Sequence, residues 1–522
     1  MGNLGGASSQ PSGSQGAPGR SVAELTRRRR PDLALAAVVA LGVLLVHDVG
    51  YVLHHAYWLD EAWVADSTRV PLSDLPQVTA VTPVGFSLLL RVAVVGGDQR
   101  HRLVPLAFAG ATLSMAYLSG RELGLRRSVS ILLLALPALF VPAMLVRDDL
   151  KPYTAEAFGA VLVLLLLLHL EARWSRRRLL ALALVVGLGP LVSNADLFIG
   201  SAALLAVAAS TLFERRWSRL REVVLAGAGA ALLMGGTLVA FVLPKQNAEL
   251  RHYWDAYYPP GDPSAAWGFL LARLQAMAPT TGLGSVPLVL VGCSLGTAAL
   301  LLRRRRSSAL LLPLAFGELV LASALHLFPL LDLRTSTWLA VLAVVLTGLG
   351  LAQVVERAAV GRRGVAVVLA ALGGGVFAVA NTGHVRDHLI PDEDVRAQAR
   401  YVQLHQRPGD VVIVDLTASF GYGYYRGTNP LPIIDSGAVS ATGFLVRYDD
   451  PAVVAMHARD RAAPGEALQE AARRLGPHGR VFVVRSHLSS PEAAGWQQAL
   501  AGCQVTTLRV GIEPLLILQG AP

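Results

Sequence analysis

The feature that most constrains this chain is its series of long apolar segments. Of its 522 residues, 53% are hydrophobic and only 16% are charged, whereas a soluble domain averages about a quarter charged residues. A helix needs about 20 mostly apolar residues to cross a bilayer. The sequence therefore predicts a polytopic α-helical membrane protein. Its apolar runs cover 33–52, 83–95, 102–119, 129–146, 154–170, 179–192, 197–213, 223–243, 282–302, 309–325, 335–355 and 364–380.

Clusters of arginine between these runs predict the sidedness of the chain. Loops rich in arginine and lysine tend to stay on the cytoplasmic side of the membrane. All of the arginine clusters can lie on the cytoplasmic side only if the run 83–95 does not cross the membrane. Pro83 and Gly85 interrupt that run, so we expect an interfacial helix there. About eleven transmembrane helices remain, with the N-terminus cytoplasmic and the C-terminal region outside the cell membrane. The clusters lie at 27–30, 121–127, 173–178, 215–221, 303–306 and 357–363.

The composition divides the chain into three parts. Residues 1–30 are rich in small and polar residues and predict a disordered cytoplasmic N-terminus. Residues 31–384 hold the membrane module, and residues 385–522 predict a small extracytoplasmic α/β domain with buried strands at 411–414 and 481–484. The net charge of +10 follows from the arginine loops, so it reflects membrane topology and not a nucleic-acid partner.

A pair of acids, Asp60 and Glu61, follows the first apolar run. Trp58 and Trp63 flank the pair, and tryptophan favours the membrane interface. A carboxylate in an outer loop can act as general base toward a hydroxyl group. The alternative is that both acids are solvated loop residues.

A second polar cluster lies in a later outer loop. An arginine can bind a phosphate through two parallel hydrogen bonds, and a lysine can bind it as a compact positive charge. A tyrosine hydroxyl can donate a further hydrogen bond to the phosphate. The alternative is a helix boundary with paired charges. The two aspartates could instead hold a divalent cation, although a third carboxylate is not evident. The cluster consists of Arg147, Asp148, Asp149, Lys151, Tyr153 and Glu156.

A third outer loop contributes His326 and Arg334. Arg334 precedes an apolar run and is a candidate second phosphate ligand, with His326 in support. An interfacial arginine that reaches toward lipid headgroups is an equally good interpretation.

Several short motifs together resemble one family of membrane enzymes. The segments 58–62, 82–85, 150–153 and 328–334, with Arg102 at the start of a run, are similar to the GT-C glycosyltransferases of family 39 type. That family includes protein O-mannosyltransferases and the lipid A aminoarabinose transferases. The resemblance covers roughly residues 33–340.

The resemblance implies a GT-C fold, a polyprenyl-phosphate sugar donor and a site on the outer face. It makes Asp60 the catalytic acidic residue and Glu61 a supporting residue. The chemistry of their side chains, apart from the resemblance, makes Arg147, Lys151, Tyr153 and Arg334 the candidate ligands of the donor phosphate. Members of the family use mannose- or arabinose-type donors, and the acceptor is a hydroxyl group on a lipid, a polysaccharide or a protein.

The residues permit three functions. In a glycosyltransferase, an acceptor hydroxyl would attack the anomeric carbon, Asp60 would take the proton, and a single displacement would invert the configuration, as in inverting glycosidases. A transporter or lipid flippase usually carries charges at the middle of its spans, whereas here only Glu318 is expected there. A non-catalytic envelope assembly protein would leave Asp60 dispensable.

Overall fold

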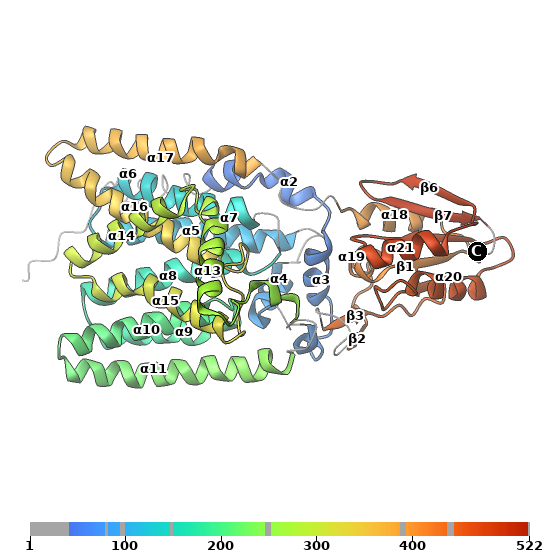
Figure 1. Ribbon diagram of the computed structural model, residues 1–522, viewed down its shortest axis with the longest axis horizontal. Coiled ribbons are helices and arrows are strands. Elements are labelled where there is room, and N and C mark those ends of the chain that lie inside the picture. Colours follow the sequence, from blue (N-terminus) through green and yellow to red (C-terminus); the bar gives the residue numbers. More distant parts are fainter. Residues whose placement is uncertain are drawn as a thin grey trace, which may run out of the picture.

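The computed structural model describes residues 41–78, 82–93, 100–146, 150–245, 252–386, 393–435 and 443–519. Figure 1 shows a helical part at one end and a smaller domain with a sheet at the other, with helix α3 (Leu59–Ser67) between them. This is the predicted class: a polytopic apolar helical module followed by a C-terminal α/β domain.

The helical part follows the apolar runs of the sequence. The predicted interfacial segment is the short helix α4 (Val84–Ala93). A π-helical turn, Ile131–Ala135, joins α6 to α7. The other helices are α2 (Val49–His54), α5 (Leu103–Glu122), α6 (Arg127–Ser130), α7 (Leu136–Val146), α8 (Tyr153–Ala172), α9 (Arg176–Leu188), α10 (Asp196–Phe213), α11 (Trp217–Thr237), α13 (Pro263–Met277), α14 (Val286–Leu302), α15 (Arg306–Ala324), α16 (Thr337–Ala358) and α17 (Arg363–Arg386).

Seven helices among the described residues are long and apolar enough to cross a membrane. They become eight if the bent pair Pro263–Thr281 and Val286–Leu302, which meet at 73°, forms one span. The sequence led us to expect about eleven. Three of the expected spans account for the difference. Helix α9 has only 13 residues, and the run 129–146 is divided among α6, the π-helical turn and α7. The run 33–52 begins before residue 41, outside the described residues.

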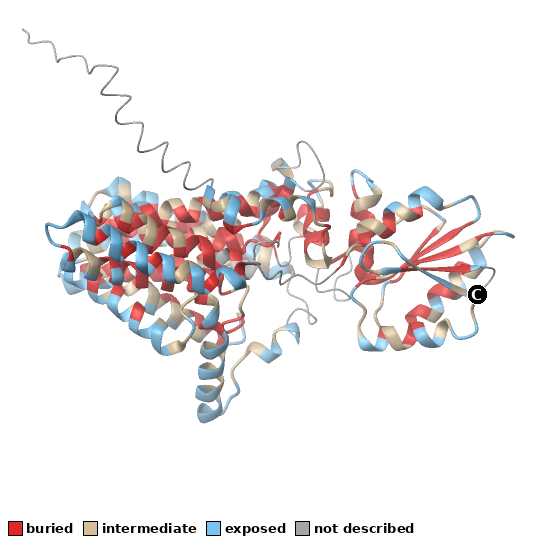
Figure 2. Ribbon diagram, turned by 90° about the horizontal axis from the view of Figure 1, so that it is seen from above, coloured by how far each residue is buried: buried red, intermediate tan, exposed pale blue. Residues whose placement is uncertain are grey.

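The core of the helical part surrounds α16. Its Trp338 is fully buried, and Figure 2 shows the buried residues in the middle of the helical part and the exposed ones around it. Helix α14 approaches α16 closely because Gly296 faces it: a Cβ atom at Gly296 would lie 2.1 Å from the carbonyl oxygen of Leu346. Small residues allow this close contact between membrane helices.

Basic loops meet at the end of the bundle that is remote from α3. Arg303 binds the carbonyl oxygen of Leu123, and the backbone N–H of Arg126 donates to Glu356 at 2.8 Å. Loops that are far apart in the sequence thus share one end of the helical part, as the proposed sidedness requires.

The C-terminal domain contains a five-stranded sheet of order β4-β1-β5-β7-β6. Strands β4, β1 and β5 are parallel, and β7 pairs antiparallel with both β5 and β6. Helices α18 and α19 cover one face and α20 and α21 the other. The strands are β1 (Val411–Val414), β2 (Ile433–Asp435), β3 (Phe444–Val446), β4 (Val453–Ala455), β5 (Arg480–Val484), β6 (Val505–Arg509) and β7 (Pro514–Gln519), and the helices are α18 (Val395–His405), α19 (Leu416–Arg426), α20 (Ala463–Arg474) and α21 (Ser490–Ala499).

Candidate functional site

Helix α3 carries both acids of the pair that follows the first apolar run. Asp60 and Glu61 lie in its first turn, where the partial positive charge of the helix N-terminus favours carboxylates. Trp58 occupies the capping position with extended backbone and provides no side-chain cap. Because successive helical residues point in different directions, the two neighbouring acids enter different environments.

Asp60 meets two cations from other parts of the chain. Arg334 Nη1 lies 3.0 Å from Asp60 Oδ2, and Lys151 Nζ lies 3.9 Å from Asp60 Oδ1. Trp63 Nε1 is 3.5 Å from Oδ1. Burial would raise the pKa of the Asp60 carboxyl, but the charges of Lys151 and Arg334 outweigh it and hold the pKa below its ordinary value. The Asp60 carboxyl group is therefore ionised. Its side chain is 25% exposed to solvent.

The two cations differ in their surroundings. Lys151 is 5% exposed, and its ammonium group lies 3.7 Å from the centre of the Trp63 ring, a cation–π arrangement that holds the charge in place. Arg334 is 30% exposed and lies over Trp58 at 5.9 Å. Lys151 is thus fixed inside the protein, whereas Arg334 lies on the solvent-exposed side of the site.

Glu61 does not share this arrangement, although it follows Asp60 directly in the sequence. It is fully buried and paired with the equally buried Arg102. Arg102 Nε donates to Glu61 Oε1 at 2.7 Å, and Nη2 binds Oε2. The same guanidinium donates to the carbonyl oxygens of Val52, His55 and Ala56. We therefore assign Glu61 a supporting role, in which it ties α3 to the chain around residues 52–56.

The other candidates lie on α8, in the loop after α15, or outside the described residues. Tyr153 and Glu156 are buried in the first turn of α8. His326 stacks on Tyr258 with ring centres 4.6 Å apart, which is an aromatic contact and not a contact with Asp60. Arg147, Asp148 and Asp149 fall outside the described residues. Across the described part of the chain, no group of three metal-binding side chains comes together.

Two residues of the C-terminal domain, Glu393 and His487, also reach the site, and no pattern in the sequence pointed to them. The carboxylate of Glu393 accepts a hydrogen bond from the backbone N–H of Leu59 at 2.9 Å, across 334 positions. His487 binds the other oxygen of Glu393 at 2.8 Å. Neither residue belongs to a recognisable motif, since Glu393 stands shortly before α18 and His487 follows β5.

Comparison with solved structures identifies the architecture. ArnT from Cupriavidus metallidurans in the apo state superimposes with a TM-score of 0.55 and covers 94% of this chain and 99% of its own, at 14% identity. The chain has the GT-C fold. The structure of ArnT bound to undecaprenyl phosphate gives a TM-score of 0.54 at 15% identity, over 94% of this chain and 98% of that one.

The GT-C likeness includes the C-terminal domain, because the alignment covers almost the whole of both chains. No protein-family model and no curated protein sequence matches the chain. At 14% identity the shared feature is the fold. The chemistry must therefore be argued from the side chains of this protein.

Proposed function

We propose that this protein is a membrane glycosyltransferase that moves a sugar from a polyprenyl-phosphate donor to an acceptor hydroxyl. The observation that carries the proposal is the contact of Asp60 with Arg334 and Lys151, at 3.0 and 3.9 Å. A base and two cations stand within a few ångströms, as transfer from a phosphate-linked sugar requires. That ArnT has been solved with bound undecaprenyl phosphate supports a donor of this class.

The proposed step is a single displacement. The acceptor oxygen forms a bond to the anomeric carbon while the bond between that carbon and the phosphate oxygen breaks. The acceptor proton passes to Asp60, and the electron pair of the broken bond leaves with the polyprenyl phosphate. Attack opposite to the leaving group inverts the anomeric configuration.

Lys151 and Arg334 would stabilise the departing phosphate. Fixed cations aimed at developing charge contribute strongly to catalysis in sites that exclude water. A phosphate that binds both cations also draws their charge away from Asp60. The pKa of Asp60 then rises, so donor binding makes the carboxylate a stronger base at the moment that a base is needed.

The sidedness and the substrates complete the proposal. We propose that the end of the bundle with the arginine loops faces the cytoplasm, as the positive-inside rule favours, and that α3 and the C-terminal domain lie on the outer face. The sugar is of mannose or arabinose type, and the acceptor is a lipid, a polysaccharide or a protein. These choices follow the family resemblance and the fold shared with ArnT, the lipid A aminoarabinose transferase. Asp148 and Asp149 remain the candidates for a divalent cation.

Transfer from radiolabelled polyprenyl-phosphate sugars to membrane acceptors tests the assignment. Asp60→Asn keeps the size of the side chain and removes the base, so the rate should fall about 10²- to 10⁴-fold. Asp74→Asn is the matched control, because Asp74 lies in the same outer segment and its carboxylate contacts the neighbouring Ser73. A near wild-type rate in Asp60→Asn would refute the catalytic role. Translocation of lipid or solute without transfer from any donor would favour the transporter.

A further inference from the structure

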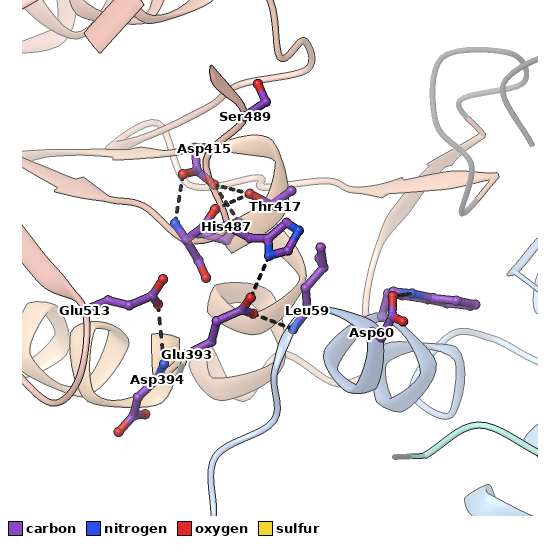
Figure 3. Close-up of polar contacts among 12 residues, drawn as sticks. Leu59, Asp60, Glu393, Asp394, Asp415, Thr417, His487, Ser489 and Glu513 are labelled. Carbon is purple, nitrogen blue, oxygen red and sulfur yellow. Dashed lines mark hydrogen bonds and ion pairs between the residues drawn. The ribbon is translucent and has the colours of Figure 1, made fainter. Parts of the chain in front are cut away.

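We propose that Glu393 of the C-terminal domain is a positioning residue that fixes the catalytic helix α3. The inference rests on the proposed role of Asp60 and adds that the outer domain completes the active site. Figure 3 shows Glu393 between Leu59 and His487, with Asp60 one residue further along α3. Glu393 is 4% exposed, so water does not compete strongly for its oxygens.

The contact replaces a missing helix cap. The first backbone N–H groups of a helix have no partner inside the helix and need an acceptor. Most helices obtain one from the residue that precedes them, but Trp58 provides none here. Glu393 Oε2 accepts from the N–H of Leu59, the first residue of α3, at 2.9 Å. The acceptor therefore comes from another domain and lies next to the proposed base.

His487 holds the other end of the same carboxylate. Its Nδ1 lies 2.8 Å from Glu393 Oε1, and this hydrogen bond is the main cause of a raised pKa of the imidazole. With one oxygen bound to each partner, the Glu393 carboxylate has a fixed orientation. Figure 3 shows that His487 and Glu393 approach the start of α3 together.

The outer domain also contacts the chain before and after α3. The N–H of Tyr57 donates to the hydroxyl of Tyr425 at 2.7 Å. Beyond the other end of the helix, Arg69 stacks on Tyr424 at 3.9 Å, and the N–H of Leu431 donates to the carbonyl oxygen of Arg69 at 3.0 Å. The domain thus holds α3 on both sides, and Glu393 provides the contact closest to Asp60.

Two substitutions separate the hydrogen bond from the charge. Glu393→Gln keeps an oxygen that can accept from Leu59 and an amide that can meet His487, but it loses the charge. Glu393→Asp keeps the charge and shortens the reach by one methylene group. Asp394→Ala is the control, because Asp394 caps α18 through the N–H of Ala397 at 3.1 Å. All variants are studied as full-length protein.

The readouts are kcat, the KM for the donor, and amide hydrogen exchange in α3. We expect Glu393→Asp to lower kcat by up to about a hundredfold, the loss that a displacement of about 1 Å can produce, with a nearly unchanged KM and faster exchange at Leu59. Glu393→Gln should stay within a few-fold of wild type in kcat, and Asp394→Ala should leave the exchange of α3 unchanged.

Three results would overturn the inference: wild-type kcat in Glu393→Asp, a larger loss in Glu393→Gln than in Glu393→Asp, or equal losses in Asp394→Ala and Glu393→Asp. If the wild-type protein transfers no sugar from any donor, the proposed function fails. Hydrogen exchange at Leu59 then still decides whether Glu393 orders α3, so the two failures are distinguishable.

Discussion

Replacement of Lys151 by methionine should move the pH dependence of transfer. The cation lies 3.9 Å from Asp60, and at an effective dielectric constant of about 20 two unit charges at that distance interact by about 4 kcal/mol. Arg334 remains beside a carboxylate that is 25% exposed to solvent, so only part of this energy acts on the pKa. We therefore expect the pKa of Asp60 to rise when Lys151 is replaced.

The sign follows from the role of the base. Asp60 must be ionised to accept a proton, and its pKa is held below the ordinary value, so the acidic limb of the pH–rate profile lies at low pH in the wild type. Lys151→Met moves the midpoint of that limb upward. The methionine side chain has a similar length and can still pack on Trp63, which limits the structural disturbance.

The assay is initial-rate transfer in proteoliposomes between pH 3 and 9 at a donor concentration well below KM, where the pH dependence of kcat/KM reports the pKa of Asp60 in the donor-free protein. The midpoint of the acidic limb is compared and not the amplitude, because loss of a phosphate ligand also lowers the rate at every pH. Arg447→Gln serves as control, since this exposed arginine pairs with Asp449 in the C-terminal domain. An unchanged or lower midpoint in Lys151→Met would show that Lys151 does not act on the base.

Two further predictions concern the support of the site and its sidedness. Arg102→Ala leaves Glu61 charged and buried, so denaturant titration in detergent should show a loss of about 3 to 5 kcal/mol in the free energy of unfolding. The double variant Glu61→Leu, Arg102→Met should recover only part of this loss, because three backbone carbonyl groups also lose their hydrogen-bond donor. An Arg102→Ala protein as stable as wild type would contradict the argument. The orientation in the membrane can be tested in a variant without the two native cysteines. A membrane-impermeant maleimide should label Ala462→Cys on intact cells, and it should label Arg177→Cys only after the cells are permeabilised. The opposite pattern would show that the protein is inserted the other way round.

The sequence did not distinguish the surroundings of the two neighbouring acids. It presented Asp60 and Glu61 as a pair, since adjacent acids between tryptophans look alike in one dimension. In the helix they diverge: Asp60 meets Lys151 and Arg334, whereas Glu61 is buried against Arg102. Arg102 was part of a recognised motif, but its partner could not be read from spacing, because the two residues belong to different helical elements.

By itself the sequence determined the class of the protein. The length of its apolar runs, the position of its arginines and the short buried strands of its last part are local properties, and local properties decide which segments enter a membrane and which form a sheet. The tertiary structure alone decided that Asp60 and Arg334 meet across 274 positions, and that Glu393 reaches the start of α3 across 334. Contacts of such sequence separation depend on how helices and domains pack, and no periodicity along the chain encodes that packing.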